Sequence, residues 1–309
     1  MRKKLLIYLP TYSRFEACLQ QAKKVHEQIS NSKIRISELE IHFCISINGD
    51  YSYDKTELSK YANSVINNPV NYGGNVNISL GFIYAKKNSF DFLWIIGDDE
   101  PIGHDAVLSI VTRLGNTTLD LIVGSKKIIG NFSEINSYME LSKLSGGTPS
   151  FISSTVYSCD FSLETAYEAL TYEFTSFPHL VVINKIFESK GSINVEMIPL
   201  DKICKVDERI YTYPKVNRRS MGARDSTVFF GKPLALMSCR DNVYKKQEMI
   251  RWWLVNWHRV SMYYSKADFR GKLLIAVSWE YKALWPLISI SILPIWKLKD
   301  LSDWFLKRE

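Results

Sequence analysis

Three adjacent carboxylates, Asp98, Asp99 and Glu100, are the residues of this 309-residue chain best suited to do chemistry. They follow Gly97 and an apolar run at 90–96 that is typical of a strand buried on both faces. Neighbouring carboxylates repel one another, and Mg²⁺ or Mn²⁺ would relieve that repulsion because hard cations take oxygen ligands. The alternative is an acidic turn before a helix, whose N-terminus favours negative charge. The triplet alone does not decide between a metal site and such a turn.

The elements that position this triplet alternate between strand and helix, as in a doubly wound α/β sheet. We expect strands at 4–9, 39–47, 64–67 and 90–96, and helices at 15–29, 54–61 and 76–87. Each strand leads into a polar or glycine-bearing loop, and the four loops contain PTYSR (10–14), NGD (48–50), NYGGN (71–75) and GDDE (97–100). Ligands bind at such strand ends in an open α/β sheet, so these four loops are expected to form one site.

The loops contain neither of the common phosphate-binding fingerprints, because GxGxxG and GxxxxGK[ST] do not occur in the sequence. This disfavours a dinucleotide oxidoreductase and a P-loop kinase. The loops instead supply an arginine, side-chain amides, glycines that let backbone approach a ligand, and carboxylates. That inventory suits a nucleoside diphosphate held through a divalent cation.

The order of these loops resembles the N-terminal half of a GT-A glycosyltransferase of the family 2 type, over about residues 4–125. The corresponding elements of that family usually read PTYNR, SDNGS, NxGxxxN and a DxD-like DDD. The resemblance implies an α/β, Rossmann-like GT-A fold, with a mixed sheet flanked by helices and a C-terminal helical appendage. It also implies a metal-dependent, inverting transfer of a hexosyl or deoxyhexosyl group from a nucleotide-sugar donor.

The resemblance further implies which residues bind the donor. The nucleotide and its diphosphate would be contacted by Pro10, Thr11, Tyr12, Arg14, Asn48, Asn71, Gly73, Gly74, Asn75 and Asp98, and the metal by Asp98, Asp99 and Glu100. Three positions depart from the family pattern: Ser13 replaces an Asn, Asn48 stands where Asp is common, and Glu100 replaces a third Asp. Which carboxylate contacts the metal therefore stays open.

The second half of the chain is expected to receive the acceptor. We expect strands at 119–127, 151–157, 193–199 and 206–213, helices at 161–172 and 178–189, and a polar segment at 131–150 that ends in a flexible loop. Inverting enzymes of the resembled family commonly have a Glu-Asp pair where this chain has Pro178-His179. His179 is a competent general base near neutral pH, although it could instead bind the metal or the leaving diphosphate. The other candidates for the base are Asp160 and Glu173.

A basic loop and a basic C-terminal region complete the set of candidates. Arg218 and Arg219 could close over the diphosphate as part of a lid, or belong to a solvated loop. Residues 243–309 hold twelve Lys or Arg against six Asp or Glu, together with seven of the eight tryptophans. Such a segment is typical of contact with an anionic membrane surface. We therefore expect a catalytic domain at 1–230 and, at 231–309, a helical region that contacts the inner membrane or forms a homodimer.

The five cysteines are odd in number and never spaced as CxxC, which favours a reducing cytosol over a disulfide framework or a structural zinc. The resulting hypothesis is a peripheral cytoplasmic enzyme that glycosylates a lipid-linked acceptor in bacterial O-antigen (lipopolysaccharide) or capsule synthesis. No nucleic-acid partner is expected. Two alternatives remain open. One is a sugar-phosphate nucleotidyltransferase, which would want a glycine-rich loop after the first strand, and the other is a non-catalytic, membrane-docked protein on the same fold.

Overall fold

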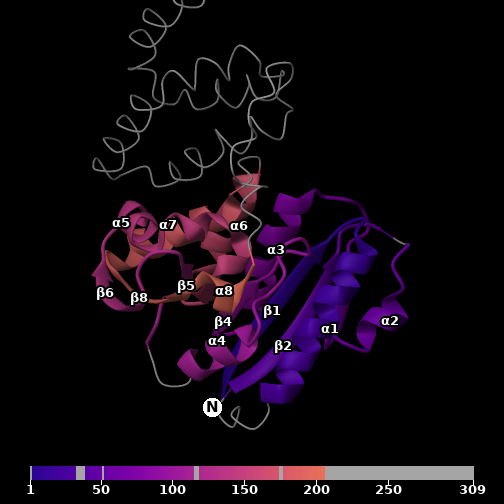
Figure 1. Ribbon diagram of the computed structural model, residues 1–309. Helices are drawn as coiled ribbons and strands as arrows, with labels where there is room; N and C mark the ends of the chain where they lie inside the picture. The colour runs from indigo at the N-terminus through magenta and orange to yellow at the C-terminus, as the bar shows by residue number, and fades with distance from the viewer. Residues whose placement is uncertain (1, 33–38, 51, 115–117, 174–176, 206–309) are drawn as a thin grey trace, which may run out of the picture. The chain divides into compact units, whose positions relative to one another are not determined.

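The computed structural model describes residues 2–32, 39–50, 52–114, 118–173 and 177–205 (Figure 1). Several expectations lie outside these residues: Arg218, Arg219, the strand at 206–213, the domain boundary at 230 and the region 231–309. Among the helices that are described, none is long and apolar enough to cross a membrane. The four cysteines in the described part (18, 44, 159 and 204) are buried and make no disulfide.

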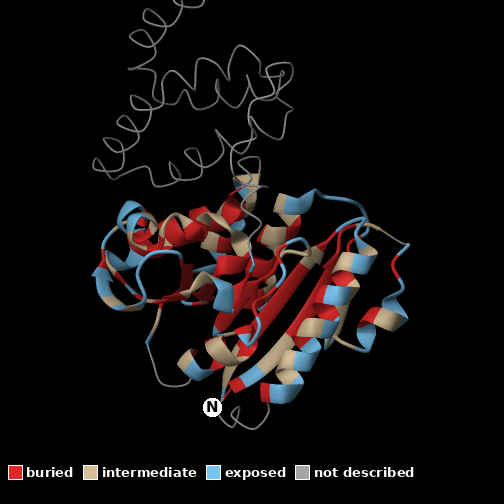
Figure 2. Cartoon of the chain, viewed as in Figure 1, coloured by how far each residue is buried: buried red, intermediate tan, exposed pale blue. Residues whose placement is uncertain are grey.

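The first half of the chain folds as the alternating pattern predicts. Its elements are β1 (Lys3–Thr11), α1 (Phe15–Ser32), β2 (Leu39–Ile47), α2 (Lys55–Ser59), β3 (Ser64–Asn67), α3 (Gly74–Lys87), β4 (Phe92–Ile95) and α4 (Ala106–Leu114). Strand β1 pairs in parallel with β2 on one side and with β4 on the other, and β2 pairs in parallel with β3. Helices cover both faces of this sheet, which explains why its strands are continuous apolar runs (Figure 2).

The second half differs from the expectation at 131–150. Its elements are β5 (Leu121–Ser125), β6 (Gly130–Ile135), α5 (Tyr138–Ser145), η2 (Thr148–Ser150), η3 (Ile152–Ser154), β7 (Thr155–Ser158), α6 (Leu163–Thr171), α7 (Pro178–Lys190), β8 (Ile193–Pro199) and α8 (Leu200–Ile203). The polar segment, for which no strand or helix was expected, contains β6 and α5. Its polar composition misled the prediction because β6 is an edge strand with an exposed face, and α5 is a short surface helix capped by Ser137. The strand expected from 151 begins only at Thr155, after two 3₁₀ turns.

The described strands form one sheet in the order β3-β2-β1-β4-β7-β5-β8-β6. Strand β7 is antiparallel to both β4 and β5, and β6 is antiparallel to β8. Strands β1 to β5 and β8 therefore all end at the same edge, here called the carboxyl edge. The chain moves outward from β1 to β2 and β3, then returns to β4 on the other side of β1. The switch point of the fold lies between β1 and β4, where α/β proteins bind ligands.

Alternate residues of β1 face the two helix layers. Leu5 and Ile7 belong to the apolar core that includes Cys18 and Ala22 of α1. On the other face, α3 approaches β1 so closely that a Cβ at Gly81 would lie 2.8 Å from the ring of Tyr8. The glycine lets α3 pack tightly against the sheet, which fixes the loop that precedes this helix.

Candidate functional site

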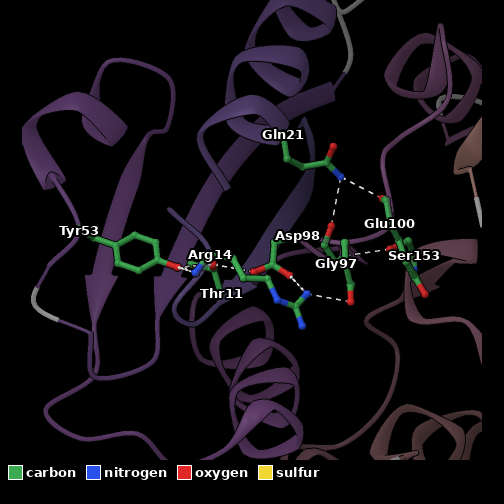
Figure 3. Close-up of polar contacts among 9 residues, drawn as sticks. Thr11, Arg14, Gln21, Tyr53, Gly97, Asp98, Glu100 and Ser153 are labelled. Carbon is green, nitrogen blue, oxygen red and sulfur yellow. Dashed lines mark hydrogen bonds and ion pairs between the residues drawn. The ribbon is translucent and has the colours of Figure 1, made fainter. Parts of the chain in front are cut away.

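The two aspartates that follow β4 share one guanidinium group. Nη1 of Arg14 lies 2.8 Å from an oxygen of Asp98 (Figure 3). The same atom lies 2.8 Å from an oxygen of Asp99. The side chain of Asp98 is 9% exposed and that of Asp99 is 40% exposed, so Asp98 is the inner member of the pair. The positive charge of Arg14 offsets the repulsion between the two carboxylates. Because Arg14 follows β1 and the aspartates follow β4, this ion pair spans the switch point.

A chain of hydrogen-bonded hydroxyl groups orients the side chain of Asp98. Thr11 Oγ1 donates to Asp98 Oδ2 at 2.8 Å, and lies 2.9 Å from the hydroxyl of Tyr53. That hydroxyl accepts the backbone N–H of Arg14 at 2.7 Å. A hydroxyl has a single proton, and Thr11 uses its proton on Asp98, so Tyr53 must donate to Thr11. The hydrogen bonds therefore run in one direction across three loops and end on the inner carboxylate (Figure 3).

The charges of this cluster are not fully balanced. Burial raises the pKa of Asp98 above its ordinary value, although the hydrogen bond from Thr11 and the charge of Arg14 act in the opposite direction. Burial alone would lower the pKa of Arg14, but its hydrogen bond to Asp99 and the charges of both aspartates raise it. Arg14 is thus firmly cationic, while the ionised form of Asp98 would gain from a further positive charge.

The donor set fits a divalent cation that shares its coordination with a ligand. The described part of the chain contains no group of three or more His, Cys, Asp or Glu residues able to hold a metal by themselves. Asp98 and Asp99 together supply two carboxylates at one point. Mg²⁺ is commonly held in this way, through one or two carboxylates, with substrate phosphates and water completing the shell. The pair therefore fits a metal bound together with a diphosphate.

Glu100, the third carboxylate of the triplet, points elsewhere. Its side chain is 4% exposed, and its Oε2 accepts the backbone N–H of Ser153 at 3.1 Å. Ser153 also accepts the backbone N–H of Gly97 at 2.8 Å, and Gln21 donates to the backbone oxygens of Gly97 and Glu100 (Figure 3). Glu100 thus fastens the acidic loop to η3. It has a different partner from Asp98 and Asp99, which both pair with Arg14.

The loops after β2 and β3 are tied to the same site by Asn48. Its Nδ2 donates to Asn71 Oδ1 at 2.8 Å, and its Oδ1 accepts the backbone N–H of Tyr72 at 3.0 Å. The backbone N–H of Asn48 donates to the carbonyl of Thr11 at 2.9 Å. Asn71 Oδ1 also accepts the N–H of Gly73 at 2.9 Å. The structure therefore joins Thr11, Asn48 and Asn71, one predicted residue from each of the first three loops, into one hydrogen-bonded group.

Gly49 is required where these two loops meet. Its φ is +75°, and a Cβ at this position would lie 2.2 Å from the carbonyl carbon of Val70. No other residue fits without moving the loop that holds Asn71. The sequence motif NGD thus reflects a close backbone approach between two loops of the site.

The remaining donor-side residues line the rim of the carboxyl edge. Pro10 lies in the last residues of β1, and Tyr12 is exposed in the loop that follows. Gly74 and Asn75 form the first turn of α3, a turn without acidic residues. Two tyrosines, Tyr12 and Tyr72, expose their rings beside these loops. Sequence reasoning selected Tyr12 but missed Tyr72, although it lies within the NYGGN segment.

Sequence reasoning also missed Tyr53, whose hydroxyl links Thr11 to Arg14. In the sequence, only its position just after the NGD loop could have indicated a role in the site. An aromatic residue at such a position is more often interpreted as part of the hydrophobic core. Tyr53 is indeed buried, with its ring edge-on to Phe15 at 5.4 Å between centroids. Its role in the site follows from the hydroxyl alone.

Of the three candidates for a general base, the topology places two on the carboxyl edge. Strand β7 runs away from that edge, α6 returns to it, and α7 starts there. Glu173, just after α6, and His179, in the first turn of α7, therefore lie on the same edge as Asp98. Glu173 is half-buried, whereas His179 is 3% exposed and its ring centroid lies 5.9 Å from that of Phe177.

Asp160, the third candidate for the base, lies at the opposite edge of the sheet. It follows Ser158, which pairs with Phe92 at the start of β4. Six residues separate Phe92 from Asp98, or about 20 Å along an extended chain. The carboxylate of Asp160 instead pairs with Lys190 at 2.6 Å. The sequence shows that Asp160 follows a strand, but not that this strand is antiparallel to β4.

Comparison with known proteins supports the fold but does not place the chain in a family. No family model and no curated protein matches the sequence. Among solved structures, S. aureus TarS 1–349 in complex with UDP matches with 11% identity and a TM-score of 0.50, over 87% of this chain and 77% of that one. The fold is that of the GT-A nucleotide-sugar transferases. The match to a longer TarS chain covers 44% of its length, so this chain spans less than half of that protein.

Two weaker matches accompany it. The mannosyltransferase PcManGT from Pyrobaculum calidifontis, in complex with GDP-Man and Mn²⁺, matches with 9% identity and a TM-score of 0.40, over 95% of this chain and 84% of that one. The 4-diphosphocytidyl-2C-methyl-D-erythritol synthase from Anaerococcus prevotii matches with 12% identity and a TM-score of 0.41, over 68% and 93%.

Proposed function

We propose that the protein is a metal-dependent glycosyltransferase that transfers a sugar from a nucleotide-sugar donor to a glycan acceptor. The supporting observation is the Asp98–Asp99 pair at the β1/β4 switch point, held by Arg14 and by the hydroxyl of Thr11. A carboxylate pair at this position, joined by hydrogen bonds to three further loops, suits a ligand with a nucleoside at one end and a diphosphate at the other.

The two aspartates would hold Mn²⁺ or Mg²⁺ against the diphosphate. The ion would act as a Lewis acid that stabilises the negative charge of the departing nucleoside diphosphate. Thr11 and Arg14 keep Asp98 and Asp99 in one orientation, so that both carboxylates face the same point. Arg14 also keeps a positive charge at the site, where it can contact a phosphate oxygen.

The loops after β1, β2 and β3 would hold the nucleoside. The exposed rings of Tyr12 and Tyr72 can stack on a base, while the buried amide of Asn48, hydrogen-bonded to the side chain of Asn71, fixes the loops around them. Gly73, Gly74 and Asn75 lie at the start of α3, where backbone N–H groups favour an anion such as a phosphate.

The finer parts of the proposal come from the sequence resemblance. The acceptor would be a lipid-linked glycan of bacterial O-antigen or capsule synthesis, and the enzyme would act at the inner face of the membrane with its 231–309 region in contact. Transfer would invert the anomeric configuration. His179 or Glu173 would accept the proton of the acceptor hydroxyl, and His179, being buried, would have to become accessible first.

Turnover of a panel of nucleotide sugars, followed as release of the nucleoside diphosphate with and without Mn²⁺, tests the proposal. We expect Mn²⁺-dependent release that is lost in Asp99→Asn. The matched control is Asp105→Asn, an exposed aspartate of the following loop whose φ of +31° suits asparagine. Equal activity in the wild type and Asp99→Asn would contradict the assignment. Condensation of a nucleoside triphosphate with a sugar phosphate would favour a nucleotidyltransferase instead.

A further inference from the structure

Four consecutive exposed residues follow β5 and form what we call the KKII loop: Lys126, Lys127, Ile128 and Ile129. The two isoleucines are 42% and 53% exposed. They are the only pair of consecutive large hydrophobic residues exposed in the described part of the chain. Two exposed aliphatic side chains next to two lysines make this surface apolar and cationic at once.

The loop is held in this conformation by its neighbours. Ser125 Oγ accepts the backbone N–H groups of Lys127 and Ile128, both at 3.1 Å. The N–H of Lys126 donates to the carbonyl of Ser145 at 3.0 Å, at the end of α5. The isoleucines therefore project from a loop whose backbone is hydrogen-bonded to the body of the domain.

The KKII loop lies on the same edge of the sheet as the acidic pair. It follows β5, which ends at the carboxyl edge, and only β7 separates β5 from β4 in the sheet. Two strand spacings correspond to about 10 Å across the sheet. Nζ of Lys126 lies 5.4 Å from the ring centroid of Phe151, next to the η3 turn that binds Glu100 through Ser153. A partner of the loop would thus sit beside the candidate site.

A second copy of the chain fits this surface poorly. The adjacent edge strand β6 has a register irregularity between Phe132 and Ile135, and Glu134 within it has φ +61°. Such a bulge blunts an edge against pairing with another strand. Across a two-fold axis, Lys126 and Lys127 would also face their own copies, which places like charges together.

We propose that the KKII loop docks on the surface of an anionic lipid bilayer. The isoleucines would enter the boundary between headgroups and acyl chains, and the lysines would lie among the anionic headgroups. The surface is apolar and cationic at once, which is the complement of such a membrane. The benefit of this contact for catalysis rests on the proposed function, because docking would turn the carboxyl edge towards a lipid-linked acceptor. The docking itself does not depend on catalysis.

Vesicle co-sedimentation of the full chain tests whether the two lysines of the KKII loop contribute to membrane binding. We expect Lys126→Gln/Lys127→Gln to bind phosphatidylglycerol-containing vesicles roughly 30-fold more weakly than the wild type, with two lysines lost from the surface. The matched control, Lys23→Gln/Lys60→Gln, removes the same charge from exposed positions on α1 and just after α2 and should remain within about twofold. An equal loss in both variants would overturn the proposal, because net charge alone would then explain binding.

A second variant and its control test whether the two isoleucines contribute to membrane binding. Ile128→Ser/Ile129→Ser should weaken binding to the same vesicles, while Leu163→Gln/Tyr167→Gln, which alters two exposed hydrophobic residues of α6, should not. The first residues of α6 lie at the opposite edge of the sheet, so this control keeps the KKII loop intact. Unchanged binding of the isoleucine variant would overturn insertion.

A local probe separates this loop from the rest of the chain. An environment-sensitive fluorophore on Ile129→Cys, in a Cys239→Ser background, is expected to shift to shorter wavelength when phosphatidylglycerol vesicles are added. The other four cysteines are buried and should not be labelled in the folded protein. No shift with these vesicles, or a concentration-dependent shift without them, would overturn the proposal; the latter would indicate self-association. Donor turnover, measured separately without lipid, reports on the proposed function alone.

Discussion

Replacing Tyr53 by Phe tests whether the hydroxyl chain through Thr11 organises the site. The substitution removes one oxygen atom and keeps the ring, so the edge-on contact with Phe15 remains and no cavity forms. The removed hydroxyl accepts the N–H of Arg14 at 2.7 Å and lies 2.9 Å from Thr11 Oγ1.

The two lost hydrogen bonds have different costs. The N–H of Arg14 loses this acceptor in a partly buried position, which costs about 1–3 kcal/mol. Thr11 keeps its hydrogen bond to Asp98, so losing its other partner costs the net value of one hydrogen bond, about 0.5–1.5 kcal/mol. The free energy of unfolding should therefore fall by about 1.5–4.5 kcal/mol.

Urea unfolding measures this cost, and calorimetric titration with a nucleoside diphosphate and Mn²⁺ measures its effect on binding. Tyr61→Phe is the matched control, because its hydroxyl makes a peripheral hydrogen bond to Glu57 at 3.3 Å. That control should change stability by less than about 0.5 kcal/mol and leave binding unchanged. Equal stability and equal affinity in Tyr53→Phe and the wild type would refute the role assigned to the hydroxyl chain.

Three further predictions follow from other contacts. Asn77→Ala should lower the free energy of unfolding by about 3 kcal/mol in urea titrations, because the hydroxyls of Tyr8 and Ser46 both lose a buried acceptor. Gly49→Ala should cost about 3 kcal/mol or more, since φ is +75° and the new Cβ collides with backbone. The raised pKa of Asp98 means that stability falls as pH rises from the ordinary value of 3.8 through the folded pKa. In Asp98→Asn, urea midpoints measured across that pH range should lack this part of the decline.

The sequence was sufficient to predict the first half of the fold because each strand is an apolar run that ends in a polar or glycine-bearing loop. The motifs around Thr11, Asn48, Asn71 and Asp98 lie at the ends of neighbouring parallel strands, and the structure joins them by hydrogen bonds. A parallel sheet places consecutive strand ends on one edge, so order along the chain was enough to predict proximity in space.

What the sequence could not show depends on contacts between distant segments. The direction of β7 decides that Asp160 lies far from Asp98, and no local pattern encodes that direction. The burial of Glu100 depends on Ser153, which is 53 residues away. Tyr53 looks like a core residue in sequence, and only its hydroxyl partners reveal its place in the site.

The proposed nucleotide-sugar site is tested most directly by calorimetric binding of a panel of nucleoside diphosphates to the full chain, with and without Mn²⁺. We expect that at least one of them binds, that Mn²⁺ strengthens binding, and that Asp98→Asn or Asp99→Asn removes the Mn²⁺ effect. These expectations follow from two carboxylates aimed at one point beside Arg14. Binding of none of the panel, or a Mn²⁺ effect that persists in both variants, would contradict a nucleotide-sugar site at the β1/β4 switch point.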